Sequence, residues 1–584
     1  MKPGKEPMAL DRRRLMLAAA GGAVAVAAPG ALAAPAVDPV SDAHLHLFNG
    51  SDLPVGKFLR YVYLPDQFPA LPPWLDAVAD AGVNVIKKLA TTARQEAGQH
   101  AFAATLNGGS EVTPERFGQV LGDYVAEGSR SPVAALNGPQ APFDPALAAS
   151  YRALVQEVSS GSLNFLQKFK IDPQTNLLNL QVDDRPALRQ VFTLAAKAAD
   201  QPPPAQLDQN LDLLNPLSLL TDAGRVVGWL YLMCKSRQSH IDKYLRDYRT
   251  GAAQPTLAIN HLVDYDRWLD DRPSIDSSHL DQVSLLATLA KRNKPKLDLR
   301  TFAGFCPFKN VLEQTGSPGQ PTTLMALQQA FSDGKIAGFK IYPPMGFQAY
   351  GNSVIPDSQF ARPADPHDEV VLRQWKAVNP GAAGKDLLGP ALDKALMDFY
   401  VWAGKNDVPL MAHGGPGNQA APGFGQRANP KHWEAAQKAL AKQGLGLRLN
   451  IGHLVHEPNA FIAAVKNNKP YPPDVWSLDA SIRMLGAGKA GTVYGDLAFM
   501  PELIDNAGLR KDFFAALKQV FSPVDPDLRH ILYGTDWILM GLKKHNTNFL
   551  NAIITGMGEA SYTEVEKTNI LYANARRFLK IDPV

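Results

Sequence analysis

The chain contains eight short apolar segments that recur at a nearly regular interval, and this repeat constrains its fold more than any other feature. Each segment has the length and composition of a buried strand and is bounded by turn or helix signals. His413 and His453 end two successive segments, and the interval from His453 to Asp536 is about twice the interval between those two histidines. The segments are 40–47, 256–263, 297–305, 337–342, 408–413, 447–453, 491–496 and 530–536.

Helical patterns lie between these segments. Residues 431–442 and 511–520 are each apolar on one face and polar on the other, as in a helix that covers a sheet. Strands that alternate with helices in units of this length predict a parallel α/β fold. Eight such units predict a (β/α)8 TIM barrel.

Two intervals break the repeat. The longest one separates His46 from the second segment, and patterns at 184–199 and 226–248 predict helices there. We interpret residues 50–250 as a large helical insertion or cap after strand 1 of a barrel domain that spans 38–584. In addition, a Pro/Gly-rich stretch runs from 343 past 362 and makes the interval from Lys340 to His413 almost twice the usual one. A loop that long is typically functional.

Residues 1–33 predict an export signal. Arg12 and Arg13 precede an Ala/Gly-rich apolar run, and Ala31-Leu32-Ala33 offers a cleavage site. This pattern resembles a twin-arginine signal, a route that carries folded proteins, often around a cofactor. A membrane anchor is the alternative, which the Ala/Gly character and the cleavage site disfavour. We therefore expect a periplasmic mature chain with no stable membrane span.

Charge and cysteine content exclude several classes of protein. The chain has 59 Lys and Arg against 56 Asp and Glu, and residues 1–33 hold five of the basic and two of the acidic residues. The remainder has no formal net charge, so nothing indicates a nucleic-acid or anionic-lipid partner. The two cysteines, Cys234 and Cys306, cannot form a Cys-rich zinc site. A metal would need His and carboxylate ligands.

The pair His44 and His46 is the strongest local signal for a site. Residues two apart on a strand point to the same face, so both imidazoles can reach one ion. An isolated His-x-His is more often part of a polar network than a ligand pair. Position favours the ligand interpretation, because four other candidates fall at or near the ends of predicted strands, where a barrel collects catalytic groups. They are Lys340, His413, His453 and Asp536.

Together these residues resemble the amidohydrolase superfamily, in particular its amidohydrolase-related (amidohydrolase 2) branch of metal-dependent hydrolases and decarboxylases. The resemblance covers about 40–48 and 255–580 and implies that His44, His46 and Asp536 bind one metal. It also implies that His413 and His453 bind a second metal or contact the substrate. The motifs are Asp42-Ala-His-Leu-His46, Gly338-Phe-Lys-Ile-Tyr-Pro343, Met411-Ala-His-Gly-Gly415, Asn450-Ile-Gly-His453 and Gly534-Thr-Asp-Trp537.

The implied ligand set, imidazoles and a carboxylate, suits Zn²⁺ first, with Mn²⁺, Fe²⁺ or Ni²⁺ as alternatives. Lys340 leaves two interpretations open. A lysine carboxylated by CO₂ would bridge two ions, whereas a free lysine would bind a substrate carboxylate or pair with a local acid. We interpret His261 and His456 as loop or substrate-contact residues. Pocket lining and a solvated loop face explain four other residues equally well: Tyr342, Arg427, Arg483 and Trp537.

The resemblance predicts a metal-dependent hydrolase that cleaves an amide, lactone or other ester bond of a small molecule with metal-activated water. Asp536 would act as general acid and base, and His453 with His413 would polarise the scissile carbonyl. The first alternative is a non-oxidative decarboxylase that uses the same ligands, which a free Lys340 would favour. The second is a non-catalytic periplasmic binding protein on the same barrel. The sequence leaves the oligomeric state open.

Overall fold

The computed structural model describes most of the predicted barrel and parts of the insertion. The described residues are 38–63, 83, 86–103, 171–172, 177–178, 229, 231–249, 253–270, 275–294, 296–360, 369–382, 385, 387–468, 481, 483–484, 492–543 and 545–581. The predicted export signal and the predicted helix at 184–199 lie outside them. The extent of the insertion, 50–250, therefore remains a prediction.

Eight parallel strands form one sheet in the order β1-β4-β5-β6-β7-β8-β9-β10. The sheet closes on itself, because the amide of Ala43 donates to the carbonyl of Tyr533 at 2.8 Å and Leu45 pairs in parallel with Trp537. The predicted (β/α)8 TIM barrel is confirmed. The strands are β1 Asp38–Leu45, β4 Ala253–His261, β5 Asp298–Gly304, β6 Gly338–Ile341, β7 Pro409–His413, β8 Arg448–Gly452, β9 Val493–Asp496 and β10 Ile531–Leu532.

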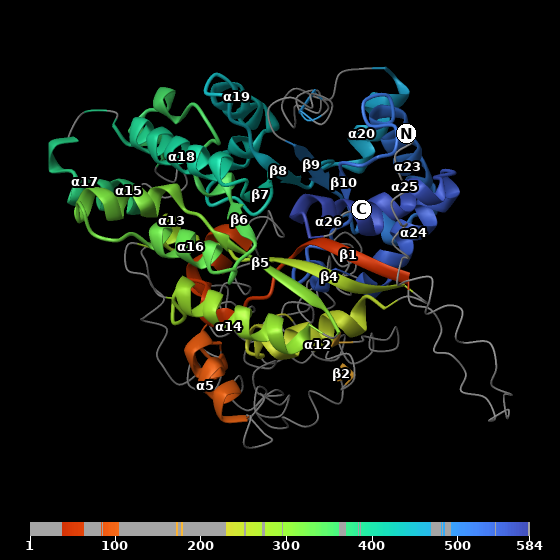
Figure 1. Cartoon of the computed structure of the whole chain (residues 1–584), viewed down its shortest axis with the longest axis horizontal. Helices are drawn as coiled ribbons and strands as arrows, with labels where there is room; N and C mark the ends of the chain where they lie inside the picture. Colours follow the sequence, from red (N-terminus) through yellow and green to blue (C-terminus); the bar gives the residue numbers. More distant parts are fainter. Residues whose placement is uncertain are drawn as a thin grey trace, which may run out of the picture.

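Helices surround the barrel, with α13 to α18 on one side in Figure 1 and α20 to α26 on the other. The predicted helices at 431–442 and 511–520 are confirmed as α19 and α23, whose first turns are capped by Asn429 and Asn506. The larger barrel helices are α14 His279–Asn293, α15 Pro307–Gly316, α16 Thr323–Ser332, α17 Val370–Val378, α18 Leu388–Lys405, α19 Pro430–Ala441, α20 Pro458–Lys466, α23 Ala507–Phe521, α24 Phe549–Glu559 and α26 Asn574–Leu579. The shorter ones are α13 Asp266–Leu269, α22 Glu502–Asp505 and α25 Glu564–Thr568.

Apolar side chains fill one end of the barrel interior. Leu257, Ile259 and Phe302 form a buried cluster with Phe578 of α26. The carbonyl of Phe578 accepts a hydrogen bond from Arg448, the first residue of β8, so α26 lies at the amino-terminal ends of the strands. The carboxyl-terminal end remains available for the polar candidates.

The described parts of the insertion are helices and one pair of strands. They include α2 Val55–Phe58, α5 Ala93–Ala103, α12 Arg237–Asp247 and the antiparallel pair β2 Ile171–Asp172 and β3 Leu177–Leu178. The buried guanidinium of Arg237 donates to Asp52 and to Glu96, both at 2.5 Å, and so joins α12 to the chain after β1 and to α5. No described helix is long and apolar enough to cross a membrane.

The long loop after β6 forms three short 3-10 helices, Pro343–Met345, Asn352–Val354 and Asp357–Phe360, before residues 361–368, which lie outside the described part. Asp393 of α18 accepts hydrogen bonds from the amides of Gly351, Asn352 and Ser353 at 2.8 to 3.1 Å. This carboxylate therefore anchors the described part of the loop to the barrel wall.

Candidate metal centre

Three of the predicted ligands converge at the carboxyl-terminal end of the barrel. Nε2 of His46 lies 3.2 Å from Oδ1 of Asp536, and Nε2 of His44 lies 3.7 Å from the same oxygen. All three side chains are buried. Their ligand atoms lie within 4.8 Å of one another, a separation that one ion can bridge.

Hydrogen bonding orients the imidazole of His46 toward the centre. Its Nδ1 donates to the carbonyl of His261 at 2.7 Å, so the neutral ring has a lone pair on Nε2. That lone pair faces Oδ1 of Asp536, a buried oxygen with no hydrogen-bond partner among the described residues. Two acceptors at this distance repel each other unless a metal ion or a proton lies between them. The donor set therefore fits a metal ion.

Asp496, at the end of β9, orients His44, and the sequence analysis did not single it out. Its Oδ2 accepts from Nδ1 of His44 at 3.1 Å, and it also accepts from the amides of His453 and Ala498 and from the side chain of Asn450. This places the lone pair of His44 on Nε2, the atom that faces Asp536. The sequence did contain a signal, since Asp496 ends its predicted strand as Asp536 does.

His413 and His453 lie next to this group. Their ring centroids are 4.7 Å apart, and that of His453 is 4.9 Å from that of His44. Nδ1 of His453 donates to the carbonyl of Ala498 at 3.0 Å, so its neutral ring presents a lone pair on Nε2. Burial and the neighbouring His453 and Lys340 hold the pKa of His413 well below its usual value, so His413 is neutral. Both rings are available to a metal or a substrate.

Lys340 is buried inside the same cluster. Its Nζ lies 3.3 Å from Nε2 of His44 and 2.7 Å from Sδ of Met411. Burial lowers the pKa of Lys340 to about 7, although Asp496 and Asp536 oppose the shift. Near neutral pH a substantial fraction of the amine is therefore uncharged, which is the form that can add CO₂.

Asp42 supports the strand end that carries His44. Its carboxylate accepts from the amides of His44 and Thr535 and from the hydroxyls of Thr535 and Tyr244, at 2.7 to 3.1 Å. Burial raises the pKa of Asp42 to about 7 despite these hydrogen bonds. Since Tyr244 belongs to α12, the insertion contributes directly to the support of the centre.

The remaining sequence candidates occupy different places. The ring of His261 lies 5.2 Å from that of His44, and its Nε2 donates to the carbonyl of Ala43. Arg427 donates to backbone carbonyls of the loop after β6, and Arg483 pairs with Glu434 on the surface. The indole of Trp537 donates to Asp247. None of these four residues lines the cavity described next, whereas Tyr342, another candidate, does.

A small cavity opens onto the centre. Its metal-ligand candidates are His46, His413 and Asp536. The rest of its described wall is mostly apolar or aromatic and consists of Phe48, Phe58, Val263, Tyr265, Tyr342, Asn418 and Leu539. A small molecule in this cavity would contact the candidate ligands on one side and aromatic rings on the other.

No family model and no curated protein matches this chain. Among solved structures it is similar to a probable 2-pyrone-4,6-dicarboxylic acid hydrolase from Acinetobacter baumannii with citric acid bound, at 11% identity over 59% of this chain and 87% of the other, with a TM-score of 0.30. It is also similar to an amidohydrolase from Burkholderia multivorans, with bound HEPES at 11% identity and TM-score 0.34, and with bound zinc at 12% identity and TM-score 0.32. Both of these cover 61% of this chain and 92% of the other. Likeness at these scores says nothing about activity, so function rests on the residues of this chain.

Proposed function

We propose that this chain is a metal-dependent hydrolase of the amidohydrolase superfamily, which cleaves an amide, lactone or other ester bond of a small molecule. One observation carries the proposal. The lone pair of His46 and the unpartnered Oδ1 of Asp536 face each other at 3.2 Å inside a buried cluster at the carboxyl-terminal end of a closed barrel. A barrel needs none of these groups to fold, and each costs free energy to bury.

His44, His46 and Asp536 would hold the ion, and His413, His453 and Lys340 complete the surrounding set. Imidazole and carboxylate ligands suit Zn²⁺ best. When bound, a divalent ion would supply Lewis-acid chemistry and make water acidic enough to ionise near neutral pH. A carboxylated Lys340 would provide the additional anionic ligand that a two-ion centre requires.

The side chains of this chain would handle the protons. Asp536 lines the cavity and can accept the proton of the attacking water and transfer it to the leaving group. His453 presents a lone pair on Nε2 in its neutral form, so it suits a metal ligand or proton acceptor and must be protonated before it can donate to a carbonyl. The Nε2 atom of His413 has no hydrogen-bond partner among the described residues and is free to contact the substrate.

Decarboxylation is the second candidate, and the position of Lys340 favours it. A buried lysine whose pKa is about 7 can hold a proton 3.3 Å from His44 and deliver it to a carbanion. A non-catalytic binding role is less well supported, because binding alone gives no reason to collect six candidate ligands. We also propose that the protein works in the periplasm after twin-arginine export, since residues 1–33 carry the signal pattern.

Metal content and product analysis test the proposal together. The purified full chain and His44→Ala are assayed for zinc per chain, and turnover is measured on matched panels of lactones, aryl esters, amides and carboxylic acids. We expect one or two ions in the parent chain, depletion in the variant with the fold intact by circular dichroism, and hydrolysis of one panel. CO₂ release from an acid would move the assignment to the decarboxylase, and a metal-free, inactive chain would support the binding protein.

A further inference from the structure

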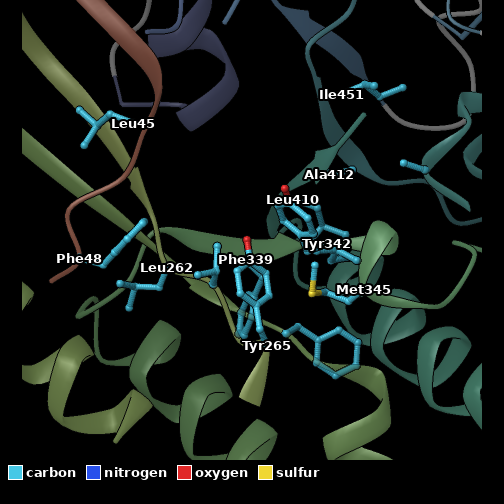
Figure 2. Packing of buried hydrophobic residues seen from close by; sticks show 14 of the residues in the cluster. Leu45, Phe48, Leu262, Tyr265, Phe339, Tyr342, Met345, Leu410, Ala412 and Ile451 are labelled. Carbon is cyan, nitrogen blue, oxygen red and sulfur yellow. The ribbon is translucent and has the colours of Figure 1, made fainter. Parts of the chain in front are cut away.

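Aromatic side chains form a continuous row from the insertion to the centre. Phe58 of α2 stacks on Tyr265 with ring centroids 5.9 Å apart, and Tyr265 meets Tyr342 edge to face at 5.0 Å. Tyr342 then stacks on His413 at 4.1 Å. All four residues line the cavity. Figure 2 shows Tyr265 and Tyr342 among the buried side chains, together with Phe48, which borders the cavity near His46.

Apart from the ligand candidates His46, His413 and Asp536, the described wall has three polar side chains, which are Tyr265, Tyr342 and Asn418. The side chains of Tyr265 and Tyr342 are hydrogen-bonded to one another, so what these two residues offer a ligand is chiefly apolar ring surface. Away from the ligand candidates, a polyhydroxylated ligand would find few partners for the hydrogen bonds that it loses to water, at a cost of about 1–3 kcal/mol for each unsatisfied group.

The few charged side chains of the described wall also favour an uncharged ligand. Its one carboxylate is Asp536, and it contains no lysine or arginine. A substrate with a second anionic group, remote from the metal, would meet no cation in this part of the cavity. An uncharged ring, in contrast, gains from both burial and edge or face contacts with neighbouring rings.

We propose that this cavity binds a flat, uncharged aromatic ring next to the bond that breaks, so that the substrate is an aryl ester or a lactone fused to an aromatic ring. This inference rests on the proposed hydrolase function and narrows its substrate class. Hydrolysis would break the acyl C–O bond, add the OH of water to the acyl carbon and leave its proton on the phenolic oxygen. The reaction needs no other reactant than water.

Phe58 is the residue that determines this specificity. It lies on the insertion, outside the barrel and away from the candidate ligands, yet it forms part of the cavity wall and stacks on Tyr265. Phe58→Leu keeps an apolar side chain of similar size and removes the ring. A matched control is Phe331→Leu on α16, which removes a ring outside the cavity wall.

Two hydroxamates with the same metal-binding group separate ring recognition from catalysis. Benzohydroxamic acid and acetohydroxamic acid are titrated by calorimetry into the zinc-loaded full chain, Phe58→Leu and Phe331→Leu. We expect the parent chain and Phe331→Leu to bind the benzo compound at least about 10-fold more tightly, because a buried ring contributes roughly 1.5–3 kcal/mol. In Phe58→Leu the preference should fall several-fold, with unchanged zinc content and unchanged affinity for the aceto compound.

The turnover of two lactones provides a second test of ring recognition. Dihydrocoumarin, whose lactone is fused to a benzene ring, should be hydrolysed at a higher kcat/KM than glucono-δ-lactone, and Phe58→Leu should raise KM for dihydrocoumarin. If zinc-loaded protein binds the two hydroxamates equally, or prefers the sugar lactone, the cavity does not select an aromatic ring. The proposed hydrolase function would not be affected by either result. A chain that retains no zinc overturns the proposed function and this inference with it.

Discussion

Nδ1 of His44 lies 3.1 Å from Oδ2 of Asp496, and both side chains are fully buried. The carboxylate holds the proton of His44 on the far side of the ring, so that Nε2 turns its lone pair toward Asp536. Such a carboxylate orients a metal ligand without touching the ion. The amide of His453 also donates to Asp496, so the same carboxylate positions both histidines.

Asp496→Asn should therefore weaken metal binding while the barrel stays folded. The asparagine oxygen can still accept from the amides of His453 and Ala498, but its NH₂ would then face Nδ1 of His44 and move the ring proton to Nε2. We expect zinc affinity to fall about 10–100-fold, measured by competition with a chelating dye. Asp298→Asn, at a partly exposed pair with Arg300, is the control. Unchanged affinity in Asp496→Asn would show that this carboxylate does not orient a ligand.

The barrel and the two imidazoles of the His-x-His motif could be predicted because both follow from local periodicity. Alternate residues on a strand share a face, and parallel strands bring their carboxyl ends together, so His44, His46 and Asp536 were expected to meet.

Other parts of the site could not be predicted from local patterns. Asp496 does end a predicted strand, but an Asp in that position commonly caps a helix, so the sequence alone could not indicate its contact with His44. The contact of Phe58 with Tyr265 joins the start of the insertion to the segment after β4, which is far away in the sequence. Arg427 was a pocket candidate by sequence position, but its guanidinium is held by the carbonyls of Gly346 and Gln359.

The zinc content of Lys340→Ala should show whether the centre holds one ion or two. If a carboxylated Lys340 bridges two ions, the variant should hold about half of the parent's zinc per chain, and added formate or propionate should restore part of its activity. If the lysine is free, zinc per chain should not change. Elemental analysis distinguishes the two, with Lys394→Ala, an exposed lysine on α18, as the control. Complete loss of zinc would contradict both roles and indicate that Lys340 supports the whole cluster.

Asp536→Asn separates metal binding from proton transfer. The amide keeps one ligand oxygen but cannot accept a proton near neutral pH, so kcat should fall about 10²–10⁴-fold while much of the zinc remains. Steady-state kinetics and zinc analysis on the same preparation check this. Asp505→Asn, which alters an exposed carboxylate paired with His545, should behave as the parent chain does. Turnover within a few-fold of the parent would rule out Asp536 as the general acid and base.

The paired arginines of the predicted signal can be tested in cells. Replacing Arg12 and Arg13 by lysine keeps the charge but removes the guanidinium pair that the twin-arginine receptor reads. We expect unprocessed precursor to accumulate in the cytoplasm, detected by immunoblotting of cell fractions. Lys2→Arg, the reverse exchange at a position outside the pair, should be exported normally. Undiminished periplasmic protein after the double replacement would indicate another route.

His279 should make the fold sensitive to mild acid, independently of the metal centre. Its Nε2 accepts a hydrogen bond from the amide of Gly304 at 2.9 Å, which only an unprotonated Nε2 can do. Burial lowers the pKa of His279 from 6.5 to about 3, with a smaller contribution from Lys309. Because the folded-state pKa lies below the unfolded one, the unfolded chain takes up a proton first, and stability falls as the pH drops below about 6.5.

The size of this effect follows from the same shift. Between pH 7.5 and pH 5 the group should remove about 2 kcal/mol from the free energy of unfolding. His279→Gln can still accept from the amide of Gly304 but does not titrate, so its stability should fall by about 2 kcal/mol less over that range. Urea unfolding of both proteins at pH 7.5, 6 and 5 measures the difference, in which the other buried histidines cancel. Parallel pH profiles would mean that His279 takes up its proton equally in the folded and unfolded chains.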